Sequence, residues 1–204
     1  MSHGAEAGEA SAVLGPDDDT LPHGGPPCRV LLIGMMGSGK TTVGELLSKA
    51  TGWPYVDNDA LVRSQHGRTS REILAAEGKE KLREAEAGAL ALGLDLPPPV
   101  ILGVAAGTIL DAGSRGALDA GGVVVWLRAG AEALVGRALD AEHRPFVDDA
   151  GRAWMVDAVR DREPLYASVA DLTVDTDAGP PSEAMSLIRS HLASAPACED
   201  RVAR

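Results

Sequence analysis

The sequence predicts a three-layer α/β/α fold, in which helices cover both faces of a five-stranded parallel sheet. Two observations predict it. Five short apolar runs alternate with helix-like segments along the chain, and strands that alternate with helices form parallel sheets. The first run also leads through a glycine-rich loop into an amphipathic helix. A length of 204 residues leaves room for one such domain.

The first strand–loop–helix unit has the sequence of a phosphate-binding loop. A buried strand is expected at residues 28–33, a helix is expected over residues 43–50, and the loop between them fits G-x-x-x-x-G-K-[ST]. A glycine turn that only joins strand to helix is the alternative, but eight matching positions in this context favour a nucleotide-phosphate site. The predicted nucleotide-binding residues are Gly34, Met35, Met36, Gly37, Ser38, Gly39, Lys40, Thr41 and Thr42.

Such a loop suits phosphate for physical reasons. Its glycines let backbone N–H groups point inward without an obstructing Cβ, and the helix N-terminus adds about half a positive charge. Lys40 supplies a full charge for the outer phosphates, and the Thr41 hydroxyl can ligate Mg²⁺. We therefore expect Lys40 to be catalytic and Thr41 to be a metal ligand.

The remaining elements follow from apolar runs, periodicity and stop signals. Gly52 is expected to end the first helix, Thr69 and Glu72 predict a capping box, Pro164 is expected to interrupt a helix, and Ser182 to cap the last one. Further strands are expected at residues 53–56, 100–104, 123–127 and 172–174. Further helices are expected at residues 60–67, 69–77, 79–94, 131–139, 154–163 and 182–192.

Composition limits the partners and the compartment. The net charge of −11 argues against a nucleic-acid or membrane partner, so an anionic substrate needs a local cluster of arginines. Cys28 and Cys198 lack metal or disulfide spacing, no apolar run approaches about 18 residues, and no signal peptide is evident. We expect a cytoplasmic protein.

Residues 1–27 are acidic and aperiodic, which predicts a disordered extension, and residues 193–204 are expected to fray.

Ligands of parallel α/β sheets bind beyond the carboxyl ends of the strands, here residues 34–41, 57–59, 105–107 and those after Leu127. Asp57 and Asp59 end the second strand, and residues two apart in an extended segment face the same side. One carboxylate can hold Mg²⁺ through water while the other accepts a proton from an attacking hydroxyl. The alternative is that Asp59 only caps the helix that follows.

Arginines are the second candidate group, because the planar guanidinium bonds two oxygens of a carboxylate or phosphate at once. Arg83 lies on a helical face beside Glu84 and Glu86, where a solvated charge is the simpler interpretation. Spacing alone does not choose among the arginines of the chain.

Five segments, taken in order, resemble the shikimate kinase family over most of the chain, from about Arg29 to Leu192. They are Gly-x-x-Gly-Ser-Gly-Lys-Thr-Thr, Tyr-Val-Asp-Asn-Asp, Glu-Gly-Lys-Glu-Lys-Leu-Arg-Glu-Ala-Glu, Arg-Pro-Phe and Arg-Glu-Pro-Leu-Tyr-Ala-Ser-Val-Ala-Asp. The first is shared with many kinases, and the other four are more specific. The resemblance implies a P-loop kinase fold with strand order 2-3-1-4-5, a kinase domain at residues 28–192 and a mobile lid at about 140–153.

The resemblance also implies roles for single residues. Asp57 resembles the acid that orients Mg²⁺, and Asp59 the one that binds and deprotonates the substrate hydroxyl. Arg83 and Arg162 resemble the pair that binds the substrate carboxylate. A monomer that uses ATP, Mg²⁺ and a small hydroxy acid is implied.

Two further arginines complete the implied site. Arg144 resembles the lid arginine that reaches the transferred phosphate, and Arg137 the residue packed beside the adenine. The chain departs from the family at the third strand, where Ala105-Ala106-Gly107 replaces three glycines, and at Leu82, where the family has Phe. Ala106 and Gly107 remain expected substrate contacts, but the added methyls can push on the substrate ring.

Three functional hypotheses follow. The first is an ATP-dependent shikimate kinase that phosphorylates the 3-hydroxyl. The second keeps the kinase but changes the acceptor to another polyhydroxylated ring or sugar acid. The third is a non-catalytic descendant that binds nucleotide or a partner, and the intact Lys40, Thr41, Asp57 and Asp59 argue against it.

Overall fold

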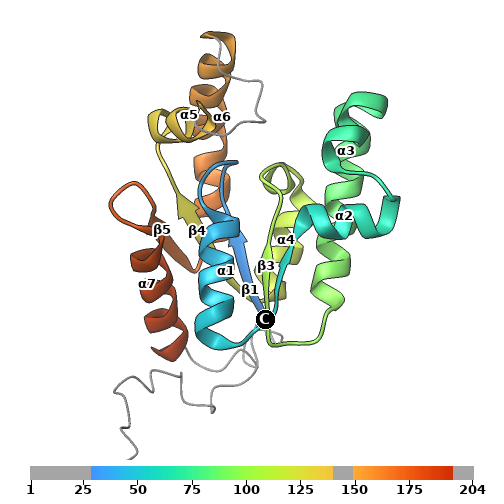
Figure 1. The fold of residues 1–204 in the computed structure, drawn as a ribbon. Coiled ribbons are helices and arrows are strands. Elements are labelled where there is room, and N and C mark those ends of the chain that lie inside the picture. The colour runs from blue at the N-terminus through green and yellow to red at the C-terminus, as the bar shows by residue number, and fades with distance from the viewer. Residues whose placement is uncertain (1–28, 140–148, 195–204) are drawn as a thin grey trace, which may run out of the picture.

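Five parallel strands form the central sheet of the computed structural model, which describes residues 29–139 and 149–194 (Figure 1). The strand order is β2-β3-β1-β4-β5. Both the predicted fold class and the predicted strand order are therefore confirmed. The strands are β1 (Arg29–Ile33), β2 (Tyr55–Asp57), β3 (Val100–Gly103), β4 (Val123–Arg128) and β5 (Leu172–Asp175).

Helices cover both faces of this sheet, as Figure 1 shows. Helices α1 and α7 pack against each other on one face, and α3 to α6 contribute to the other. None of the helices in the described part of the chain is both long and apolar enough to cross a membrane. The helices are α1 (Lys40–Thr51), α2 (Asn58–His66), α3 (Ser70–Asp95), the 3₁₀ helix η1 (Thr108–Leu110), α4 (Ala112–Gly121), α5 (Ala131–Leu139), α6 (Asp149–Ala167) and α7 (Pro181–Ser194).

The core lies on both faces of the sheet, because alternate residues of β1 point to opposite sides. Val30 and Leu32 pack toward α1 and α7, whereas Leu31 and Ile33 belong to the cluster that includes residues of α3, α4, α5 and α6. A strand that is covered on both faces needs no polar alternation, which explains the continuous apolar run in the sequence. Burial on both faces fixes β1, and with it the position of the loop that follows.

Most local signals in the sequence were correct. Gly52 and Gly67 end α1 and α2 in the left-handed conformation, and Thr69 and Glu72 form the predicted capping box. The expected boundary between two helices is a kink inside α3, where Gly78 has φ 85° and ψ −176°.

Two predictions about elements were wrong, and two elements were not predicted. No sequence signal predicted η1 and α4, because residues 105–122 are mostly small and only Ser114 and Leu118 of α4 are buried. Helix α6 continues through Pro164 to Ala167, because Tyr166 is buried beyond the proline. The last helix begins at Pro181, so its predicted cap lies within the first turn; proline suits that first position because its φ is already helical.

The mobile lid at about 140–153 stays a prediction. Residues 149–153 belong to the first turns of α6, so the end of the predicted lid is helical. Residues 140–148, the predicted disordered extension and most of the predicted fraying tail lie outside the described residues.

Candidate active site

A cavity of about 1120 Å³ opens at the carboxyl ends of the strands, where the sheet rule predicts a ligand site. It is lined by the loop after β1, by residues 57–59 and 103–107, and by side chains of α3, α5 and α6. Of the segment after Leu127, Arg137 lines the large cavity, whereas Ala129 and Gly130 line a smaller one. All other predicted site residues in the described part of the chain line the large cavity, except Gly34.

Gly34 and Gly39 show why the loop after β1 needs glycine. Gly34 has φ 143°, and a Cβ there would lie 2.5 Å from the carbonyl oxygen of Leu127. Gly39 has φ 93° and precedes α1. The Lys40 ammonium donates hydrogen bonds to the carbonyls of Gly34 (2.9 Å) and Met35 (3.0 Å). The lysine charge is thus held over the loop whose amides would receive phosphate.

Arg137 ties α5 to this loop and to the end of β5. Its guanidinium donates to the carbonyl of Gly37 at 3.2 Å and to the carbonyl of Thr176 at 2.6 Å. An ion pair with Asp177 at 3.3 Å further restrains the Arg137 guanidinium. The placement of Arg137 beside the adenine stays a prediction. Arg144 lies outside the described residues.

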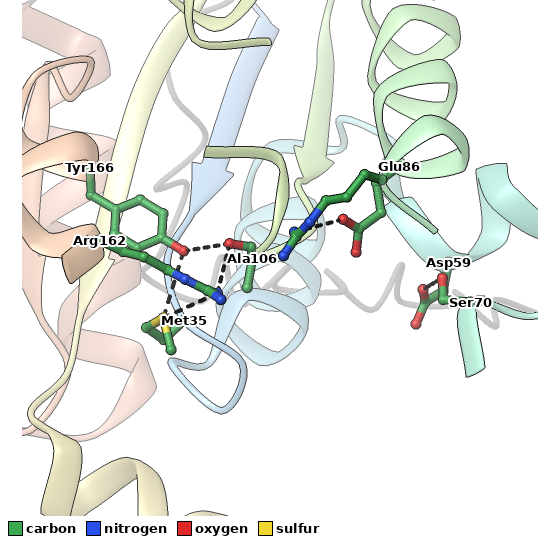
Figure 2. A network of polar contacts seen from close by, with 8 residues as sticks. Met35, Asp59, Ser70, Glu86, Ala106, Arg162 and Tyr166 are labelled. Atoms are coloured by element: carbon green, nitrogen blue, oxygen red, sulfur yellow. Dashed lines mark hydrogen bonds and ion pairs between the residues drawn. The ribbon is translucent and has the colours of Figure 1, made fainter. Parts of the chain in front are cut away.

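Asp57 and Asp59 both line the cavity, but the geometry differs from the one predicted. Asp57, not Asp59, caps α2: its Oδ1 accepts the Asp59 backbone N–H at 2.9 Å. Asp59 lies in the first turn of the helix, so the two do not share an extended segment. The Asp59 carboxylate accepts a hydrogen bond from the Ser70 hydroxyl at 2.5 Å, which joins α2 to α3 (Figure 2).

The other oxygen of Asp57 accepts two hydroxyl donors, Tyr55 at 2.8 Å and Thr41 at 3.3 Å. Burial raises the pKa of the Tyr55 phenol and the neighbouring Asp57 charge raises it further, so the phenol keeps its proton and donates. Thr41 and Asp57 therefore present oxygen atoms side by side at the start of α1. Such a set fits Mg²⁺, which prefers oxygen ligands and is usually held by one or two carboxylates, water and substrate phosphates.

Arg83 lines the cavity, and its side chain is 35% exposed. Its partner Glu86 comes from the same helix and is labelled in Figure 2. The Arg83 Nη1 lies 3.3 Å from the Glu86 carboxylate, whose side chain is only 11% exposed. Burial raises the pKa of Glu86, and the Arg83 guanidinium opposes that rise. The guanidinium lies directly over Gly107, where an added Cβ would overlap Nη1. Arg83 is therefore more than a solvated charge, because it also pairs with Glu86 and lines the cavity.

Arg162 approaches the same strand end from the other side. Its Nη1 donates to the carbonyl of Ala106 at 3.2 Å, and the hydroxyl of Tyr166 donates to that carbonyl at 3.0 Å (Figure 2). The side chain is buried, and its guanidinium carbon lies 5.7 Å from the ring centre of Trp154. Among the described residues its hydrogen-bond acceptors are neutral. The guanidinium groups of Arg162 and Arg83 thus contact two consecutive residues of the cavity wall, Ala106 and Gly107.

A family model described as shikimate kinase matches residues 36–193. The chain belongs to the shikimate kinase family.

Curated relatives agree with this assignment. A shikimate kinase from Symbiobacterium thermophilum is 40% identical over 153 residues, which are 72% of this chain and 86% of the relative. One from Moorella thermoacetica is 37% identical over 151 residues, 74% of this chain and 86% of the relative. A structure of the Acinetobacter baumannii shikimate kinase in complex with shikimate has a TM-score of 0.73 and 29% identity, and the match covers 79% of this chain and 90% of that one.

Sequence reasoning missed several residues that shape the site of this shikimate kinase family member. Glu86 could have been paired with Arg83 by its helical spacing of three residues, but was assigned to a solvated face instead. Ser70 belongs to no predicted motif, Trp154 was predicted only as a helix residue, and Tyr166 only as part of a family segment. Their contacts join distant parts of the chain, which no local pattern reveals.

Proposed function

We propose that the protein transfers the γ-phosphoryl group of ATP to the 3-hydroxyl of shikimate, which yields ADP and shikimate 3-phosphate. The observation that carries the proposal is the pair of arginines, Arg83 and Arg162, at consecutive residues of the segment after β3, in the same cavity as the phosphate-binding loop. A carboxylate is the ligand that two such guanidinium groups favour. The bound shikimate in the structure of the Acinetobacter relative supports the same acceptor.

In the proposed reaction the acceptor oxygen bonds to the γ-phosphorus while the bond from that phosphorus to the β–γ bridging oxygen breaks. The proton of the acceptor hydroxyl passes to the Asp59 carboxylate. The Ser70 hydroxyl holds that carboxylate in place, so the base needs little rearrangement as the proton arrives. The Lys40 ammonium leaves its loop carbonyls to follow the charge of the transferred phosphate, and Arg144 is assigned the same task.

Asp57 and Thr41 would hold Mg²⁺ with the nucleotide phosphates. When bound, the ion neutralises charge that develops on the phosphates during transfer. Arg137 would lie beside the adenine, because it already joins the loop carbonyl of Gly37 to the end of β5. Ala106 and Gly107 would present their backbone to the acceptor ring.

A coupled assay of ADP release tests this function, with shikimate compared against a panel of other cyclic and open-chain hydroxy acids. We expect turnover that requires Mg²⁺, is highest with shikimate, and yields a product of the mass of shikimate 3-phosphate. A higher kcat/KM with another hydroxy acid would favour the second candidate, a kinase of another polyhydroxylated acid. Ala105-Ala106 and Leu82, all on the cavity wall, are the residues that favour this candidate.

We further infer a monomer located in the cytoplasm. The absence of disulfide spacing between the two cysteines suits a reducing compartment. Light scattering coupled to size-exclusion chromatography would test the first point, and cell fractionation the second.

A further inference from the structure

Tyr55 of β2 occupies a space that two glycines leave for it. A Cβ on Gly44 of α1 would overlap the Tyr55 ring, and one on Gly103 of β3 would overlap its hydroxyl. The ring is therefore held between a helix and the neighbouring strand. Its hydroxyl has little freedom, because the ring cannot move toward either side.

The hydroxyl reaches the carboxylate that we assign to the metal. Tyr55 donates to Asp57 Oδ2 at 2.8 Å, which is shorter than the 3.3 Å bond from Thr41 to the same atom. The backbone N–H of Asp59 occupies Oδ1 at 2.9 Å. Because both carboxylate oxygens accept a hydrogen bond, the rotation of the Asp57 carboxylate about its Cβ–Cγ bond is fixed. Without the phenol, Oδ2 keeps only the long bond from Thr41, whose oxygen is also needed as a metal ligand.

We propose that Tyr55 is a positioning residue of the nucleotide–magnesium site, whose hydroxyl fixes the Asp57 carboxylate beside Thr41. The proposal rests on the proposed function, since it needs Mg²⁺ at Thr41 and Asp57. It assigns the hydroxyl a role separate from that of the ring. The ring fills space and supports the fold, whereas the hydroxyl orients a single carboxylate.

The test is Tyr55→Phe, which keeps the ring and removes one oxygen atom. We expect the Kd of ADP measured calorimetrically in Mg²⁺ to rise about 10-fold, the lower end of the effect of losing a partner of a metal-binding residue. The Kd of ADP measured in EDTA should stay unchanged, as should the KM for shikimate. The Mg²⁺ concentration for half-maximal turnover should rise by a similar factor.

The matched control is Tyr166→Phe, since the chain has two tyrosines. That variant removes the donor to the Ala106 carbonyl on the acceptor side, so it should raise the KM for shikimate and leave the Mg²⁺ requirement unchanged. Tyr55→Leu removes the ring as well and should lower Tm. A Tyr55→Phe protein with wild-type Kd in Mg²⁺ would overturn the proposal. So would an equal loss of ADP affinity in Mg²⁺ and in EDTA.

A measurement on the full-length chain covers the case in which Tyr55→Phe does not fold. Biosynthetic 3-fluorotyrosine gives two ¹⁹F resonances, which the Tyr166→Phe variant assigns. Adding Mg²⁺ to the ADP complex should shift the Tyr55 resonance much more than that of Tyr166. An unmoved Tyr55 resonance would refute the positioning role. If wild-type protein binds ADP equally well with and without Mg²⁺, the role of Tyr55 at the metal site is overturned. If wild-type protein shows no Mg²⁺-dependent turnover of ATP with shikimate, the proposed function itself fails, and that outcome is distinct from the failure of Tyr55 alone.

Discussion

The substitution Gly107→Ala should separate substrate binding from folding. Gly107 has φ −82°, a value that alanine adopts without strain. The added Cβ would nevertheless overlap Arg83 Nη1 and lie 2.5 Å from Glu86 Oε2. Because both atoms end flexible side chains, the backbone can stay in place while the Arg83–Glu86 pair moves away. The variant should therefore fold normally with a displaced guanidinium.

The expected change in the KM for shikimate follows from the contact that the displaced Arg83 guanidinium would lose. Hydrogen bonds to charged groups contribute about 1.5–3 kcal/mol, and each 1.4 kcal/mol is about a factor of ten. Loss of the Arg83 contact should therefore raise the KM for shikimate roughly 10- to 100-fold, with the KM for ATP unchanged. The effect on stability should be small. A partly exposed ion pair contributes at most about 1 kcal/mol, and the lower entropy of the unfolded alanine chain offsets about 0.4–1 kcal/mol.

Steady-state kinetics and a thermal melt check this prediction. Gly116→Ala is the matched control, because a Cβ at Gly116 of α4 meets no atom within 4 Å. That variant should keep wild-type kinetics and gain up to about 1 kcal/mol from helix propensity. The reasoning about Arg83 is refuted if Gly107→Ala keeps a wild-type KM for shikimate, or if its KM for ATP changes instead.

Four further predictions address other parts of the site. Lys40→Ala should abolish turnover with little change in Tm; substantial residual turnover would contradict the role of the loop. Asp59→Asn should lower kcat far more than it raises the Kd of ATP, measured by calorimetry, because an amide cannot accept the proton. Ala105→Gly with Ala106→Gly should lower the KM for shikimate by an amount worth about 1–3 kcal/mol and leave the KM for ATP alone. Burial raises the pKa of the Glu86 carboxyl, so ionisation of this group opposes folding. The free energy of unfolding should therefore fall as pH rises through that raised pKa. Thermal melts at several pH values should show a smaller fall for Glu86→Gln.

The phosphate-binding loop and the sheet could be predicted because their signals are local. Residues 30–33 form one apolar run, and burial on both faces of a parallel sheet produces such a run directly. Gly52 and Gly67 end their helices by a preference that needs only the residue itself. The capping box at Thr69 and Glu72 likewise lies within four residues of sequence.

The errors arose where a distant contact decides the local structure. Pro164 removes one helical hydrogen bond, but two residues later Tyr166 is buried and bonds to the Ala106 carbonyl, 60 residues away. Asp57 takes the cap of α2 while Tyr55 and Thr41 hold its second oxygen. Helix α4 has few apolar residues, because burial of a single leucine, Leu118, is enough to pack this helix against the sheet.

Residues 105–107, which follow β3, differ in the side-chain size that their surroundings allow. The carbonyl of Ala105 accepts the Thr108 backbone N–H at 3.1 Å, and that of Ala106 accepts Arg162 and Tyr166. Every residue type supplies these carbonyls, so the protein's own contacts do not demand glycine at either position. Gly107 is different, because the Arg83 guanidinium occupies the volume of its missing side chain. We therefore expect any demand for glycine at 105 and 106 to come from the ligand, so that their replacement by alanine should affect the acceptor and not the fold.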